Sequence, residues 1–169
     1  MNEDQQLDAI SRLHGLFGRQ DLDYWLFGGW AVDFHAGRVT RQHADIDMAV
    51  WVADLDRAKE VLDREGWILS RDALQDGYAE FGNQSMHLDL TYLARDETTG
   101  AVYTPLAQGR GAWPDGTFGE DLKELNGVQS HVVSLGSLIA DKSELRGDPS
   151  TASKDRADVV VLVSLPSDR

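Results

Sequence analysis

The sequence predicts an α+β (or α/β) fold in which a small mixed sheet is flanked by helices. Two kinds of hydrophobic spacing lead to this expectation. Apolar residues recur every three or four positions in some segments and every second position in others. The chain contains neither internal repeats nor a low-complexity tract. We therefore expect residues 1–169 to form a single domain, with a helical portion at about residues 134–165.

The N-terminal half is predicted to alternate between helices and strands. Residues 4–19 carry apolar side chains at helical spacing and should form an amphipathic helix. The apolar run YWLFG is expected to be a buried strand, and GWAVDFHAG to be two turns of helix that its final glycine closes. After a basic loop, DIDMAVWV has the alternation of a strand, and a helix should follow over residues 55–65.

The C-terminal half contains more predicted strands and two helices. Residues 94–127 are rich in Gly, Asp, Thr and Pro and lack periodicity, which predicts a long connection or lid. A helix over SLGSLIADKSEL has a suitable N-cap in Ser134, and KDRADVVVLVSL predicts the last helix. Four further segments have the spacing of strands: GWILS, YAEFG, MHLDLTYL and VQSHVV.

Composition and charge limit the classes of function. The formal net charge is -13, which disfavours nucleic acid as a partner because phosphates would be repelled, and which would attract a cation. With 0 cysteines, disulfides and thiolate metal sites are excluded. The start MNEDQQLDAI is acidic rather than leader-like, and no apolar run reaches the length of a membrane span. We expect a cytoplasmic protein that does not bind membranes.

Three carboxylates suggest a metal site. Asp45 and Asp47 lie two positions apart in a predicted strand and therefore project to the same face, with Ile46 pointing into the core. Asp89 has the same surroundings in a second strand. If the two strands are neighbours, three like charges come together and require a cation between them. Mg²⁺ prefers oxygen ligands, and a pair of such ions roughly 3.5–4 Å apart serves in-line phosphoryl or nucleotidyl transfer.

The adjacent Gly28 and Gly29 join a predicted strand to a predicted helix. Bare backbone N–H groups at a helix N-terminus can bind phosphates, and a glycine permits the close approach that this requires. An ordinary turn is the alternative for a glycine pair alone. The paired aspartates that follow, together with Asp89, favour the phosphate interpretation.

Basic and aromatic residues near these motifs have two interpretations each. Arg38 and Arg41 could reach phosphates from the loop before the aspartates, or pair with nearby carboxylates. Lys142 could be a triphosphate clamp or a solvated helical lysine. His43 is expected to hydrogen-bond the loop rather than ligate a metal, because the site already offers hard oxygen ligands. Trp30 is expected in the core rather than under a nucleotide base.

The stretch GGWAVDFHAGRVTRQHADIDMAV resembles the signature of the nucleotidyltransferase superfamily, in which a Gly-Gly or Gly-Ser turn precedes an Asp-x-Asp strand. More narrowly, it is similar to the small antibiotic nucleotidyltransferases, namely the aminoglycoside 2″-adenylyltransferases and the lincosamide nucleotidyltransferases. The resemblance is dense over about residues 24–93 and visible again at KDRADVVVL. It implies the polymerase-β-like fold.

The resemblance also implies roles for individual residues. Asp45 and Asp47 would ligate two Mg²⁺ ions, and Asp89 would bind the second ion, accept the proton of the acceptor hydroxyl, or both. These three would be the catalytic residues. The nucleotide-binding candidates are Gly28, Gly29, Arg38, Arg41 and Lys142.

The function implied is that of a Mg²⁺-dependent adenylyltransferase acting in antibiotic resistance. It would transfer AMP from ATP to a hydroxyl of an aminoglycoside, a small cationic acceptor, by a two-metal in-line mechanism. Three alternatives stay open: a lincosamide acceptor, a macromolecular acceptor as in some toxin–antitoxin pairs, and a catalytically dead nucleotide-binding module. A homodimer could complete the acceptor site of so short a chain.

Overall fold

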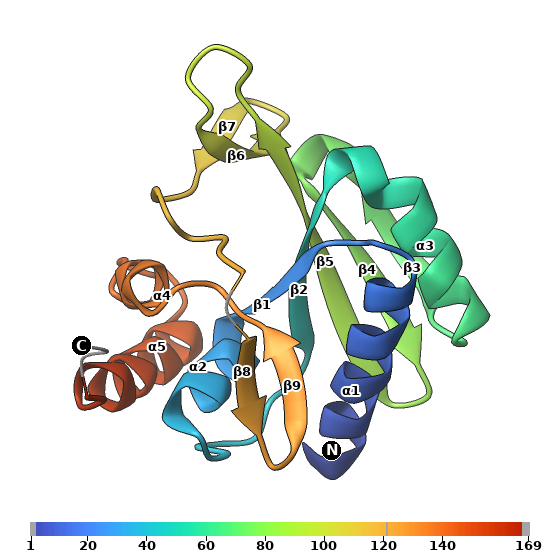
Figure 1. The fold of residues 1–169 in the computed structure, drawn as a ribbon. Helices are drawn as coiled ribbons and strands as arrows, with labels where there is room; N and C mark the ends of the chain where they lie inside the picture. Colours follow the sequence, from blue (N-terminus) through green and yellow to red (C-terminus); the bar gives the residue numbers. More distant parts are fainter. Residues whose placement is uncertain (1–2, 121, 167–169) are drawn as a thin grey trace.

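A computed structural model describes residues 3–120 and 122–166 and arranges them as helices around a mixed sheet (Figure 1). Within these ranges, no helix combines the length and the apolar character that crossing a bilayer requires. In chain order the elements are α1 (Glu3–Arg19), β1 (Tyr24–Phe27), α2 (Gly28–Ala36), β2 (Ile46–Trp51), η1 (Val52–Asp54), α3 (Leu55–Arg64), β3 (Ile68–Ala73), η2 (Leu74–Asp76), β4 (Tyr78–Asn83), β5 (Met86–Arg95), β6 (Val102–Leu106), β7 (Gly109–Ala112), β8 (Leu122–Leu125), β9 (Val128–His131), α4 (Leu135–Lys142) and α5 (Pro149–Val163).

The main sheet has seven strands and both strand directions. Its central order is β1-β2-β5-β4-β3, and β6 and β7 extend it from β5. Strands β2 and β5 run parallel, whereas β1–β2, β3–β4 and β4–β5 are antiparallel. A separate two-stranded ribbon, β8–β9, lies beside β1 and is joined to it by a bridge between Leu26 and Val132. The mixed sheet with its helices confirms the predicted fold class.

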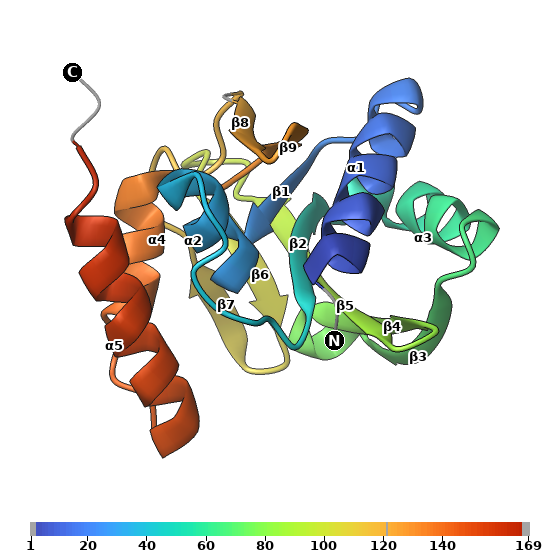
Figure 2. The same ribbon diagram turned by 90° about the horizontal axis from the view of Figure 1, so that it is seen from below.

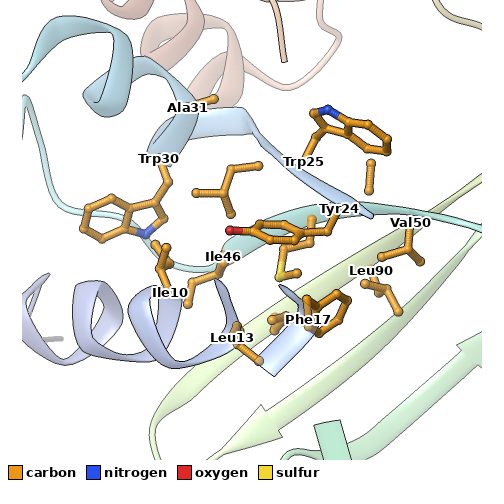
Figure 3. Close-up of a cluster of buried hydrophobic side chains, with 14 of the residues drawn as sticks. Ile10, Leu13, Phe17, Tyr24, Trp25, Trp30, Ala31, Ile46, Val50 and Leu90 are labelled. Carbon is orange, nitrogen blue, oxygen red and sulfur yellow. The ribbon is translucent and has the colours of Figure 1, made fainter. Parts of the chain in front are cut away.

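The core lies between one face of the sheet and the helices α1 and α3. The even-numbered residues of β2, such as Ile46 and Val50, point to this face together with Leu90 of β5, because side chains alternate along a strand. They meet Leu13 and Phe17 of α1, as Figure 3 shows. The opposite face carries the odd-numbered residues of β2 and β5 and is not covered by α1 and α3.

Helices α2, α4 and α5 gather at the β1 edge of the sheet. They lie together on the side opposite to α1 and α3 in both views of the chain (Figures 1 and 2). Helix α2 follows β1 without a linker and ends at Ala36, where Gly37 adopts the left-handed conformation (φ 68°). The Ser134 hydroxyl accepts a hydrogen bond from the Ser137 N–H and caps α4.

The segment 94–127 differs from the long connection that its composition predicts. It holds the end of β5, the β6–β7 hairpin and the whole of β8, and the hairpin extends beyond the rest of the sheet in Figure 1. Its Gly, Asp and Thr residues form the turns between short strands. Asp96, for example, accepts backbone hydrogen bonds from Thr98 and Thr99. Because turn residues are frequent throughout the segment, its composition did not indicate the strands of four and five residues that lie between the turns.

The packing of the core predicts that truncating two leucines to alanine lowers the free energy of unfolding by very different amounts. Leu90 is 0% exposed at the centre of β5, whereas Leu145 is 102% exposed. Leu90→Ala should lower the free energy of unfolding by about 3 kcal/mol through lost burial and a cavity. Leu145→Ala should change it by less than about 0.5 kcal/mol. Urea denaturation followed by circular dichroism measures both, and equal effects would contradict this assignment of the core.

Candidate active site

Asp45, Asp47 and Asp89, hereafter the carboxylate triad, converge at one end of the central strands. Asp47 lies opposite Phe27 of β1 and directly beside Asp89 of β5 in the parallel register. Residues in register point to the same face of a sheet, so both carboxylates leave the face that α1 and α3 do not cover. Asp45 immediately precedes β2. One carboxylate oxygen from each member lies within 4.8 Å of the other two.

The surroundings of the triad disfavour negative charge on it. Burial raises the pKa of Asp47 well above its ordinary value, and the neighbouring charges of Asp45 and Asp89 raise it further. The ammonium of Lys142 acts in the opposite sense. Burial and the charges of Asp45 and Glu80 raise the pKa of Asp89 to about 6. The fold therefore holds three carboxylates in a place where the charges of the protein do not balance them.

The donor set of the triad fits a divalent metal ion. Its three carboxylates are hard oxygen ligands, all partly exposed, and close enough together to share a cation. Mg²⁺ takes such ligands and completes its octahedral shell with water and phosphate oxygens. A bound cation would also remove the repulsion that raises the two pKa values. The structure thus brings together the three residues that the sequence nominated as metal ligands.

The two glycines before the triad lie in close contact with their neighbours, Gly28 with the triad and Gly29 with the loop that leads to it. Gly28 has φ 64°, and a Cβ at this position would lie 2.1 Å from Asp47 Oδ2. A Cβ on Gly29 would lie 2.4 Å from His43 Nδ1 and 2.8 Å from Arg41 Nη2. Both positions therefore require glycine for packing. Helix α2 begins at Gly28 without a side-chain cap, so its N-terminus is suited to an anion; contact with phosphates stays a prediction.

The three basic candidates differ in their surroundings. Arg41 donates two hydrogen bonds of 3.0 Å to the carboxylate of Asp158 on α5. Lys142 lies 2.9 Å from Asp155 and 3.1 Å from Asp158 on the same helix. Pairing with a carboxylate was one of the two interpretations of Arg41, whose Nη2 lies against Gly29. The side chain of Lys142 is 9% exposed, so it is not the solvated lysine of the second interpretation, and its charge acts on Asp47 of the triad. Arg38 is exposed and forms no ion pair with any residue that the structure describes.

Sequence reasoning missed the carboxylates that hold these cations. Asp155 and Asp158 are 4% and 2% exposed, and Arg146 adds a contact of 3.1 Å to Asp155. The two aspartates are three positions apart, which places them on one face of α5. The spacing of the two aspartates in KDRAD could have indicated a shared binding face. The same residues are equally typical of the polar first turn of a helix.

Two further features were outside the predicted site. Behind α2, Asp33 and His43 form a buried pair with Nε2 2.5 Å from Oδ2. His43 thus bonds to helix α2, and the hydrogen bond within its own loop that was expected is the one of 3.2 Å with Arg41. Trp30 is buried at 1% exposure, as expected. Between α4 and the β6–β7 hairpin lies a cavity of about 360 Å³, lined by Thr104, Gly111, Ala112, Trp113, Pro114, Ser137, Ala140, Asp141 and Glu144.

A family model described as "Aminoglycoside-2''-adenylyltransferase" matches residues 9–162, which include every element from α2 to α4 and all members of the triad. The chain belongs to this family. The match extends over the segment 94–127, where the sequence alone showed little resemblance.

Relatives of known name share shorter segments with the chain. A segment of 43 residues, 25% of this chain, is 42% identical to a 2''-aminoglycoside nucleotidyltransferase of Escherichia coli and covers 24% of that protein. A segment of 78 residues, 43% of this chain, is 32% identical to a lincosamide resistance protein of Staphylococcus haemolyticus and covers 47% of it. The chain thus matches about a quarter to a half of the length of these relatives.

Solved structures establish the fold. The crystal structure of ANT(2'')-Ia in complex with adenylyl-2''-tobramycin has a TM-score of 0.76 at 19% identity, over 95% of this chain and 88% of that one. The lincosamide antibiotic adenylyltransferase LnuA with lincomycin bound has a TM-score of 0.70 at 20% identity, over 90% and 92%. The chain therefore has the polymerase-β-like fold of nucleotidyltransferases.

Two glycines with similar backbones predict different costs for a methyl group. Gly28 and Gly37 have φ of 64° and 68°, but a Cβ would collide with Asp47 at Gly28 and meet nothing within 4 Å at Gly37. Gly37→Ala should cost about 1 kcal/mol from backbone strain alone. Gly28→Ala should cost at least about twice as much and weaken Mg²⁺ binding, because Asp47 must move. Thermal unfolding and metal titration check both, and identical behaviour of the variants would contradict the contact.

Charge repulsion in the triad predicts a variant that stabilises the metal-free protein. Because the pKa of Asp89 is about 6 in the folded protein, above its ordinary value, stability is lost as the pH rises through 6. Asp89→Asn should therefore raise the free energy of unfolding by about 1 kcal/mol at pH 8 in the presence of EDTA, after allowance for solvent screening. The gain should vanish near pH 4 and reverse on addition of Mg²⁺. An unchanged melting temperature at pH 8 would contradict the repulsion.

Proposed function

We propose that the protein transfers AMP from ATP to a hydroxyl group of an aminoglycoside antibiotic. One observation carries this proposal: the triad lies against the N-terminus of α2, so carboxylates for metal ions adjoin an anion-binding backbone. Membership of the aminoglycoside-2''-adenylyltransferase family supports the choice of reaction and acceptor.

In this proposal, cationic and backbone N–H groups would bind the phosphates of the nucleotide, and the carboxylates would bind the metal ions. Gly28, Gly29 and the N-terminus of α2 would bind the phosphates of ATP, with Arg41 and Lys142 as nearby cations. Mg²⁺ ions held by the triad would neutralise the phosphate charge that develops during an in-line displacement. The acceptor oxygen forms a bond to the α-phosphorus as the bond to pyrophosphate breaks. Asp89 is the proposed acceptor of the hydroxyl proton.

The cavity beside α4 has the chemistry of a site for a cationic sugar. Its volume of about 360 Å³ falls within the range of small-molecule sites. Asp141 and Glu144 offer carboxylates for ammonium groups, and Trp113 offers an aromatic face. The cavity adjoins the triad: Asp141 acts electrostatically on Asp47, and the ring of Trp113 lies 5.8 Å from that of Phe27.

The acidic residues of the segment 94–127 contribute less than their number suggests. Asp96 lies 2.6 Å from Arg110 and accepts backbone hydrogen bonds, so its charge is already balanced. Glu120 and Asp115 are exposed near its end, and Asp121 lies outside the described residues. Asp141 and Glu144 also contact an arginine, Arg146, at 2.8 and 3.5 Å, but unlike Asp96 they line the cavity. They are therefore the better candidates to bind an amino-sugar.

A lincosamide is the second candidate acceptor. The specific observation that favours it is the 78-residue match to a lincosamide resistance protein, which is longer than the matches to the aminoglycoside enzymes. A nucleic-acid acceptor is disfavoured by the net charge of -13. An inert nucleotide-binding module is disfavoured because it would not require three carboxylates to be held together against their mutual repulsion.

A substrate panel tests the proposal directly. The protein is incubated with ATP, Mg²⁺ and a set of aminoglycosides and lincosamides, and each product is weighed by mass spectrometry. We expect the addition of one AMP to at least one aminoglycoside. Addition to lincosamides alone would select the second candidate, and no adduct on any compound would overturn the antibiotic assignment.

A substitution in the triad tests the site separately. Asp47→Asn should lower the rate of AMP transfer by at least about a hundredfold, because it removes a metal ligand and its charge. Asp56→Asn, an exposed carboxylate on α3, is the matched control and should retain full activity. Initial rates with pyrophosphate detection compare the two. Full activity in Asp47→Asn would show that the triad is not the metal site.

A further inference from the structure

A buried pair behind the glycine turn links the loop between α2 and β2 to the helix. Asp33 of α2 is 0% exposed, and its Oδ2 lies 2.5 Å from Nε2 of His43 in the loop. Its Oδ1 accepts hydrogen bonds from the backbone N–H of Thr40 at 3.0 Å and from the Thr40 hydroxyl. One carboxylate therefore fixes two points of the loop that leads to Asp45.

The hydrogen bonds of His43 determine which ring nitrogen carries the proton. Nε2 faces a carboxylate and so donates its proton to Asp33. Nδ1 lies 3.2 Å from Nη1 of Arg41, which can act as a donor alone, so Nδ1 accepts. The imidazole also lies against Trp30, with the ring centroids 4.6 Å apart. Its orientation is thus fixed by contacts on each side.

The guanidinium of Arg41 is held from two directions. His43 accepts from Nη1 on one side, and on the other side Asp158 accepts from both Nε and Nη2 at 3.0 Å. Nη2 lies so close to Gly29 that a Cβ there would be 2.8 Å away. Arg41 is therefore presented to the turn where α2 begins, with its side chain still 26% exposed.

Burying charges in this way is costly to stability. A buried ion pair is commonly no more stabilising than apolar residues of the same shape. A buried carboxylate and imidazole directly behind the turn are better explained by the geometry that they impose. Hydrogen bonds with fixed acceptors can hold a guanidinium in the one orientation in which it faces a phosphate.

We propose that Asp33 and His43 are positioning residues for nucleotide binding, which act by orienting Arg41 toward the triphosphate at Gly28–Gly29. This inference rests on the proposed function, because it requires a nucleotide at that turn. The two residues make no contact with the nucleotide themselves. Their contribution should therefore disappear when Arg41 is absent.

A double-mutant cycle on Arg41 and His43 tests this coupling. The dissociation constant of Mg·ATP is measured by calorimetry for wild type, His43→Ala, Arg41→Ala and the double variant. Each single substitution should weaken binding by roughly tenfold, the scale of one hydrogen bond to a charged group. The double variant should bind no more weakly than Arg41→Ala. The KM for the acceptor should stay within about twofold of the wild type.

The controls separate positioning from stability. His14→Ala removes another partly buried imidazole, bonded to Tyr24 at 2.9 Å, and should leave Mg·ATP binding unchanged. Asp33→Asn keeps the shape and one acceptor for His43, so it should weaken binding less than His43→Ala and serves if that variant does not fold. Melting temperatures of all variants are recorded in parallel.

The outcomes distinguish this inference from the proposed function. Multiplicative effects of His43→Ala and Arg41→Ala would overturn the coupling. So would unchanged Mg·ATP binding in both His43→Ala and Asp33→Asn while the wild type binds and transfers AMP. If the wild type itself fails to bind Mg·ATP, the proposed function fails and the inference fails with it.

Discussion

Repulsion among three carboxylates at the start of two neighbouring strands is the constraint on which the rest of the site depends. Asp47 and Asp89 meet because β2 and β5 run parallel in register, which brings the beginnings of both strands to the same end of the sheet. Burial strengthens the repulsion, since less water remains to screen it. Lys142 offsets part of the negative charge at Asp47, and Asp141 adds to it. The fold thus supplies the ligands and leaves the balancing charge to be supplied by a cation.

The cations near the triad are themselves restrained by buried carboxylates of α5. Arg41 and Lys142 share Asp158, and Lys142 and Arg146 share Asp155. Arg146 also contacts Asp141 and Glu144, at 2.8 and 3.5 Å, so the three cations meet four carboxylates and the group has no excess positive charge. Because each cation has a carboxylate partner on α5, none of the three forms an ion pair with the triad in the described part of the chain. Helix α5 therefore keeps these cations apart from the carboxylates of the triad.

The sequence predicted the elements with clear periodicity and the residues that lie together within one motif. The strand with Asp47, the helix closed by Gly37 and the third carboxylate at Asp89 were all found by spacing, and the family model confirmed the resemblance. Asp45 was predicted inside that strand and lies just before it. The β6–β7 hairpin was missed because its strands, VYTPL and GRGA, contain proline and glycine, which are typical of turns and not of strands. Asp33 and Asp158 were not recognised because their roles come from tertiary contacts with the basic loop. No local pattern distinguishes a buried aspartate of this kind from a solvated one on a helix.

The glycine pair illustrates how a single motif can satisfy two constraints. A backbone that binds phosphates requires close approach, and this alone would explain glycine at both positions. The structure shows a second reason, which holds before any ligand arrives. Asp47 fills the space where a side chain of Gly28 would lie, and His43 and Arg41 fill the space at Gly29. Asp47, the proposed metal ligand, and Arg41, the proposed phosphate contact, are thus both in contact with the same turn. Because one dipeptide contacts both side chains, a substitution there would disturb the proposed metal site and the proposed anion site together.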